Sequence, residues 1–157
     1  KTSLGERILD LIFTSFIFWL ASIGMHEFFH YNVARMFGQE ISVSFSWISG
    51  FTKINFQGTF SNIIIALAGG LGVGMLFLLL DKFDNDYETS LVLNLLGFIH
   101  IVYALTESIF VYGLISQVQS EIGAIIGAII GVLVWKYRYV DNGDGLDKFS
   151  NWGDIFE

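Results

Sequence analysis

Long apolar segments dominate the chain and are separated by short polar stretches. The pattern predicts four helices, at about residues 8–37, 61–80, 91–115 and 122–139. Because about 20 helical residues cross the hydrocarbon core of a bilayer, each segment is long enough to span a membrane. We therefore expect a mainly α, polytopic membrane protein with about four transmembrane helices in a single domain, residues 1–140.

The segment between the first two helices, at about residues 41–56, has a different pattern. Its apolar residues from Ile41 to Trp47 alternate with serines, which is the period of two typical of a strand. Ser49-Gly50 is a turn signal, and residues 51–56 can form a return strand. The pattern predicts a short β-hairpin. It must lie at the membrane interface or against the helices, because lipid cannot pair with open backbone groups.

The composition supports a membrane protein and narrows its chemistry. The chain is 54% hydrophobic and only 15% charged, whereas soluble domains contain about 25% charged residues. The net charge of -7 argues against a nucleic-acid partner. Acidic residues gather in residues 81–88 and in a polar acidic tail, residues 141–157. Because the chain has no cysteine, any metal would be bound by His, Asp or Glu side chains.

Basic residues indicate how the chain is oriented in the membrane. With four spans, the two termini and the second loop lie on one side, and they hold all the Lys and Arg residues except Arg35 and Lys53. An excess of basic residues marks the cytoplasmic side of a membrane protein. The distribution predicts that both termini are cytoplasmic.

An H-E-x-x-H pentad, His26-Glu27-Phe28-Phe29-His30, lies in the first predicted helix. Residues four apart share one face of a helix, so His26 and His30 can bind one metal ion together. Glu27 is then placed to polarise a metal-bound water. Because ionisable groups at membrane depth are costly, their presence here indicates a functional site.

The third predicted helix carries a polar stripe formed by His100, Tyr103 and Glu107, which share one face. A carboxylate buried in a membrane requires a partner, such as a metal or a histidine. A catalytic zinc site has three protein ligands and one open position. We expect Glu107 to be the third ligand, with His100 beside the metal. The reverse assignment, with His100 as the ligand, stays open.

These residues and the motifs beside them resemble the site-2 proteases, a family of intramembrane zinc metalloproteases, or shorter zincin-like membrane relatives. The pentad is followed by A-R-M-F-G at residues 34–38, similar to the A-x-x-F-G that commonly follows it in that family. G-T-F-S-N at residues 58–62 looks like the family's G-P-x-x-N. The family's N-x-x-P-x-P-x-x-D-G motif is matched only at Asn94, because other residues replace both prolines and the aspartate: Gly97, Ile99 and Val102.

The resemblance implies zinc-assisted hydrolysis of a peptide bond in or near a membrane segment, with a membrane protein or peptide as substrate. In that chemistry Glu27 is the general base, and His100 or Tyr103 stabilises the oxyanion. The implied site residues are the Zn²⁺ ligands His26, His30 and Glu107, the catalytic groups Glu27, His100 and Tyr103, and the substrate contacts Asn62 and Asn94. The edge of the hairpin offers an extended substrate a strand to pair with.

Three other interpretations are open. The departure from the family's third-ligand motif fits a catalytically inactive zincin-like subunit, with a structural role beside other subunits of a membrane complex. The pentad can also be a chance match whose polar residues lie at the membrane surface. Haem binding by the histidines is less consistent, since it leaves Glu27 unexplained.

Overall fold

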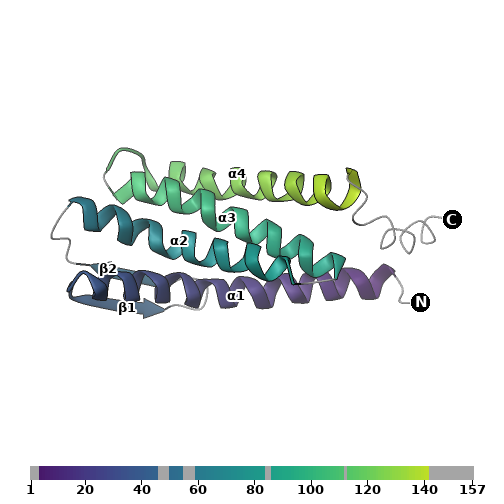
Figure 1. Ribbon diagram of the computed structural model, residues 1–157, viewed down its shortest axis with the longest axis horizontal. Helices are drawn as coiled ribbons and strands as arrows, with labels where there is room; N and C mark the ends of the chain where they lie inside the picture. The colour runs from purple at the N-terminus through teal and green to yellow at the C-terminus, as the bar shows by residue number, and fades with distance from the viewer. Residues whose placement is uncertain (1–3, 46–49, 55–58, 84–85, 112, 142–157) are drawn as a thin grey trace.

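The computed structural model describes residues 4–45, 50–54, 59–83, 86–111 and 113–141. Its helices run side by side in an elongated bundle (Figure 1). They are α1 (Leu4–Met36), α2 (Thr59–Asp81), α3 (Tyr87–Val111) and α4 (Gln117–Lys136), and a π-helical turn, η1 (Tyr137–Asp141), follows α4. All four α-helices in this part of the chain are long and apolar enough to cross a membrane. The predicted fold class, a mainly α polytopic membrane protein, is confirmed.

The helices begin and end at residues that differ from the prediction by up to about five positions. Asp86 caps α3, because its Oδ2 accepts a hydrogen bond from the Thr89 N–H at 2.9 Å. The polar residues after Ser116, which precede the predicted fourth helix, form the start of α4. There Ser116 and Gln119 form a reciprocal capping box. Capping therefore extends these helices beyond their apolar segments. Of the predicted acidic tail, residues 142–157 lie outside the described residues.

Close contacts between helices depend on glycines. On α2, Gly70 and Gly74 lie against the α3 backbone, at the carbonyls of His100 and Gly97. On α4, Gly127 and Gly131 lie against the α3 backbone in the same way, and Gly123 faces the Thr106 side chain of α3. Because glycine has no side chain, the helix backbones approach closely and gain van der Waals contacts. These contacts hold the helices together in lipid, where the hydrophobic effect does not drive helix association. As a result α3 packs tightly between α2 and α4.

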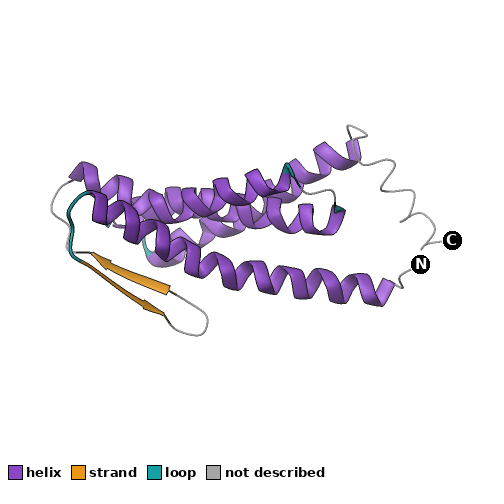
Figure 2. Cartoon of the chain, turned by 60° about the horizontal axis from the view of Figure 1, so that its bottom comes forward, coloured by secondary structure: helices purple, strands orange, loops and turns teal. Residues whose placement is uncertain are grey.

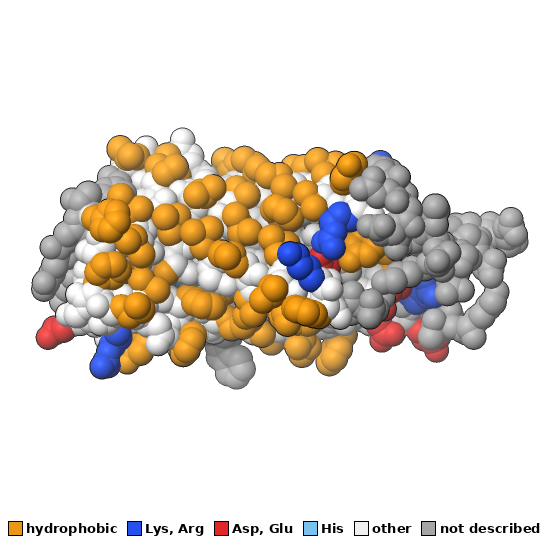
Figure 3. Space-filling view, in the orientation of Figure 1, with side chains coloured by type: hydrophobic (Ala, Val, Ile, Leu, Met, Phe, Trp, Pro, Cys, Tyr) orange, Lys and Arg blue, Asp and Glu red, His pale blue; other side chains and the backbone are white. Residues whose placement is uncertain are grey.

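Apolar residues fill the interior and also cover the outside of the bundle. The buried core is formed by α2 and α3: Val73, Phe77, Val92, Leu93 and Leu96. One stripe of α1 packs against it, through Leu11, Phe18, Met25 and Phe29. Large apolar side chains are exposed along all four helices, and in the view of Figure 3 the charged side chains gather toward the two ends. This surface suits a bilayer, in which apolar side chains face lipid.

Two short strands lie beside the C-terminal half of α1 (Figure 2). They are β1 (Ile41–Phe45) and β2 (Gly50–Ile54), which pair antiparallel with Ile41 opposite Ile54. The predicted turn at Ser49-Gly50 falls partly on residues 46–49, outside the described residues, as do residues 55–58. At the start of this region, α1 ends at Gly38 with a positive φ of 69°, the conformation that favours glycine after a helix.

A buried polar cluster joins three helices at the opposite end of the bundle. Asp81, the last residue of α2, is 1% exposed. Its carboxylate accepts hydrogen bonds from the Ser90 hydroxyl of α3 and from the Arg138 guanidinium of η1. The Tyr139 hydroxyl donates a longer one of 3.4 Å. At the same end, Arg7 of α1 lies 3.8 Å from Glu88 of α3. Both ends of the described chain therefore meet at this end of the bundle, as an even number of spans requires.

Candidate metal site

The two histidines of the pentad lie on the buried face of α1, as their spacing predicts. His26 and His30 are 9% and 6% exposed, and their rings meet edge to face with centroids 4.6 Å apart. Both lie inside the first membrane-spanning helix, toward the end that carries the strands. The Nε2 atoms of the two rings are 2.9 Å apart, so their polar edges converge on one point.

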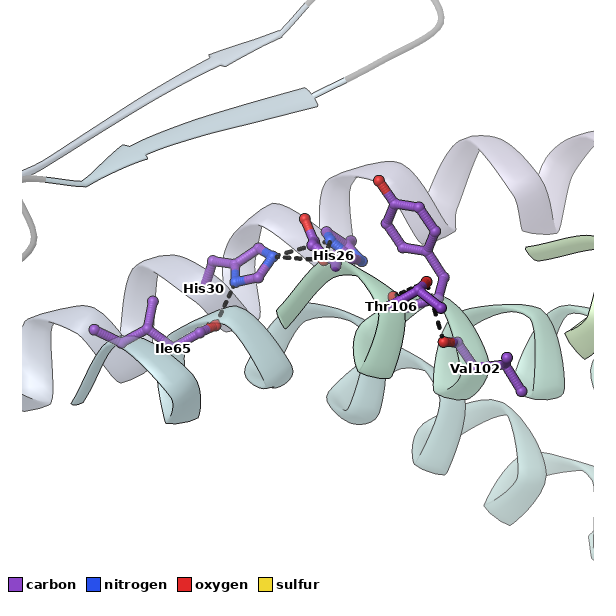
Figure 4. A network of polar contacts seen from close by, with 7 residues as sticks. His26, His30, Ile65, Val102 and Thr106 are labelled. Carbon is purple, nitrogen blue, oxygen red and sulfur yellow. Dashed lines mark hydrogen bonds and ion pairs between the residues drawn. The ribbon is translucent and has the colours of Figure 1, made fainter. Parts of the chain in front are cut away.

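A backbone carbonyl of α2 orients His30. The Nδ1 atom of His30 lies 2.6 Å from the Ile65 carbonyl oxygen (Figure 4). A carbonyl oxygen can only accept a hydrogen bond, so Nδ1 carries the proton. In the neutral ring the lone pair is therefore on Nε2, the atom that faces His26. This is the arrangement in which a histidine can bind a metal through Nε2.

Glu107 of α3 supplies the third polar atom. Its Oε2 lies 3.4 Å from His26 Nε2 and 3.8 Å from His30 Nε2. This oxygen is buried and has no hydrogen-bond partner in the described part of the chain. A buried carboxylate oxygen without a donor is costly in an apolar environment. Two imidazole nitrogens and one carboxylate oxygen thus form a triangle of potential metal-ligand atoms: His26 Nε2, His30 Nε2 and Glu107 Oε2.

The size of this triangle fits a small metal ion. Zinc binds nitrogen and oxygen ligands at about 2.0–2.1 Å, and a tetrahedral arrangement then separates two ligand atoms by roughly 3.3 Å. The edges of the triangle, 2.9, 3.4 and 3.8 Å, lie on both sides of that value. Two histidines and one carboxylate are also a donor set that zinc accepts at catalytic sites. The residues therefore fit a divalent metal in both spacing and chemistry.

His100 and Tyr103 line the site without belonging to the triangle. Their ring centroids lie 5.9 and 6.1 Å from that of His26. The Nδ1 atom of His100 is 2.8 Å from the Leu96 carbonyl of its own helix. Within the described residues, the group whose ligand atoms converge contains Glu107 and not His100. The geometry thus favours Glu107 over His100 as the third ligand.

The other predicted site residues lie at different distances from this triangle. Glu27 is buried, 6% exposed, immediately after His26. Asn62 is in the first turn of α2, on the face that also carries Ile65, and its buried Oδ1 has no hydrogen-bond partner among the residues that the structure describes. Asn94 is fully buried and donates to the Ser90 carbonyl at 2.9 Å. It lies about 20 Å from Glu107 along α3 at 1.5 Å per residue, so the structure does not bring it to the site.

Two features of the site were not predicted as parts of it. The Ile65 carbonyl has no signature in the sequence, because every residue has one. Gly69 lies one turn after Ile65 on α2, in a glycine-rich segment of the kind that indicates only close packing between membrane helices. A Cβ atom at Gly69 would collide with the rings of both His30 and His26.

Comparison with known proteins gives no relative from which to transfer a function, since no family model, curated protein or solved structure matches the chain. The assignment of this site therefore rests on its own residues.

Proposed function

We propose that the protein is a membrane-embedded zinc metalloprotease that cleaves a peptide bond in or near a membrane segment. The observation that carries the proposal is the triangle of potential ligand atoms inside a bundle of membrane-spanning helices. Ionisable groups gathered at this depth are costly unless a partner such as a cation stabilises them. The H-E-x-x-H pentad, with its resemblance to the site-2 proteases, directs the proposal toward peptide hydrolysis.

His26, His30 and Glu107 are the proposed metal ligands. A zinc ion held by them would supply Lewis acidity, which polarises a substrate carbonyl and acidifies water. The three side chains are 11%, 7% and 21% exposed. The exposure of Glu107 leaves an approach for water and substrate, while the two imidazoles stay enclosed.

Glu27 is the proposed general base. It lies one residue after His26 and three before His30, so it is within one helical turn of both ligands. A buried carboxylate there can take a proton from water and pass it to the leaving amine. Replacement by glutamine keeps the shape of the side chain and removes this proton transfer.

Tyr103 is the better of the two candidates for stabilising the oxyanion. The Nδ1–H of His100 is committed to the Leu96 carbonyl, so the Nε2 of its neutral ring has a lone pair and no proton to donate. The Tyr103 hydroxyl is a donor in its ordinary protonation state. Its ring lies 6.1 Å from that of His26, at the side of the triangle. We therefore propose that Tyr103 stabilises the oxyanion and that His100 only lines the site.

The substrate is proposed to be a membrane protein or peptide bound in an extended conformation. The buried Oδ1 of Asn62 has no donor within the described ranges, and a substrate backbone N–H would supply one. The strand pair beside α1 has an outer edge that can pair with an extended chain. Asn94, which is fully buried, is left out of the proposed substrate contacts.

Elemental analysis of the purified protein beside its His26→Ala variant tests the metal. We expect about one zinc per chain in the wild type and none in the variant. Hydrolysis is tested separately with Glu27→Gln, which should keep zinc and lose cleavage of a membrane substrate. Zinc without hydrolysis of any candidate by the wild type would favour an inactive zincin-like subunit. Absence of metal from the wild type would overturn the site itself.

A further inference from the structure

Gly69 of α2 faces the metal ligands directly. A Cβ atom built on it would lie under 3.0 Å from the Cδ2 atoms of both His30 and His26, and it would also clash with His30 Nε2. These atoms belong to the edges of the two rings that converge on the triangle. The space that an alanine side chain would fill is therefore occupied by the two imidazoles.

The same glycine leaves room for the His30 ring beside the carbonyl that orients it. In an α-helix, the Ile65 carbonyl accepts the N–H of residue 69. A carbonyl oxygen has a second lone pair, which here receives the Nδ1–H of His30 at 2.6 Å. A Cβ at residue 69 would overlap the other edge of this ring, at Nε2 and Cδ2, so the ring fits in this position only beside a residue without a side chain.

We infer that Gly69 is a positioning residue of the metal site. Its missing side chain lets His30 bond to the Ile65 carbonyl, which fixes the ring orientation and leaves the Nε2 lone pair for the metal. The inference deepens the proposed function, since it rests on the metal site. Groups that orient a metal-binding histidine in this way typically change metal affinity 10- to 100-fold when they are lost.

The neighbouring glycines of α2 have different surroundings. The space beside Gly70 and Gly74 is filled by atoms of α3, including its backbone. The space beside Gly72 is filled by the Phe29 ring of α1, which packs against the apolar core. Gly72 is thus a matched control. It lies on the same helix and faces the same neighbour with an equally tight fit, but it touches no proposed ligand.

The first experiment measures zinc affinity by competition with a chelator for the wild type, Gly69→Ala and Gly72→Ala. We expect Gly69→Ala to bind zinc roughly 10- to 100-fold more weakly than the wild type, and Gly72→Ala to bind it within a few fold of the wild type. Replacing zinc with Co²⁺ adds a spectroscopic test, because the visible absorption reports ligand geometry. The Co²⁺ spectrum should change in Gly69→Ala and stay that of the wild type in Gly72→Ala.

The second experiment needs no variant, so it holds even if Gly69→Ala does not fold. Nitrogen NMR of the metal-free wild type, with ¹⁵N-labelled histidines, should show His30 as the tautomer protonated at Nδ1. The opposite tautomer overturns the inference. Equal zinc affinities for Gly69→Ala and the wild type, or equal losses in both glycine variants, also overturn it and leave the metal site standing. A wild type that binds no zinc overturns the proposed function instead.

Discussion

Asp81 and Glu107 are both buried carboxylates, at opposite ends of the bundle, and they have opposite surroundings. Asp81 accepts hydrogen bonds from Ser90, Tyr139 and the cationic Arg138. Glu107 faces two imidazoles, and its Oε2 has no hydrogen-bond donor in the described part of the chain. Within the described residues, Asp81 therefore has a cationic partner and several donors, whereas Glu107 Oε2 faces two imidazoles and accepts no hydrogen bond.

This difference separates a structural ion pair from a candidate site. A buried charge is tolerated when it is paired and its remaining lone pairs are satisfied. Asp81 meets that condition with residues of the chain, so it joins α2, α3 and η1 without help. We propose that Glu107 and the two histidines meet it through a bound cation. We therefore expect substitutions at the two carboxylates to affect different properties of the protein.

The largest expected effect is on zinc affinity. Glu107→Gln keeps the size of the side chain but removes one of three ligands, so the affinity should fall by more than roughly 100-fold, beyond the usual loss for an orienting group. Asp81→Asn should leave the affinity unchanged. Chelator competition with both variants measures the contrast. An equal loss of zinc affinity in the two variants would show that the affinity depends on correct folding of the bundle and not on the Glu107 side chain.

The next effect is the stabilisation that zinc provides. A ligand at 100 times its dissociation constant raises the free energy of unfolding by about 2.7 kcal/mol. We expect this increment in the wild type and in Asp81→Asn, and its absence in Glu107→Gln at the same zinc concentration. Thermal unfolding in micelles with zinc or chelator measures it. If zinc stabilises Glu107→Gln as much as the wild type, Glu107 is not a ligand.

In the metal-free protein the order of the two variants should reverse. Asp81→Asn weakens hydrogen bonds to a charged group, which are worth about 1.5–3 kcal/mol each, so it should lower the free energy of unfolding by about that amount. Glu107→Gln removes an oxygen that lacks a donor and should cost less. Denaturant titration of the two zinc-free variants makes the comparison. A greater loss for Glu107→Gln would mean that Glu107 is already paired without metal.

The smallest effect concerns a single donor of the Asp81 cluster. Ser90→Ala removes the hydroxyl that donates to Asp81, while Arg138 stays in place. The expected loss of stability is about 1 kcal/mol, with zinc affinity unchanged. Ser108→Ala is a control, because that exposed hydroxyl only donates to the Leu105 carbonyl of its own helix. The control should unfold at the wild-type denaturant concentration within error.

The sequence was sufficient to predict the spans and to place His26 and His30 on one face of the first helix. Apolar composition alone determines which segments can cross a bilayer. His26 and His30 follow from their spacing, and few ionisable groups of the third helix could join them. The choice between Glu107 and His100 depends on how α3 is rotated about its axis, which the sequence pattern does not fix. Helix ends were missed where polar caps such as Asp86 and Ser116 extend a helix beyond its apolar residues.

The corners of the triangle come from α1 and α3, two helices that pack on each other much less than each packs on α2. An ion held there would be a cross-link between segments far apart in the chain, from His30 to Glu107. Because the three ligand atoms come together only when both helices are docked, binding of the ion would stabilise that docked state. Departure of α1 from the bundle and release of the ion would then be one event, so metal content would report the attachment of the first helix.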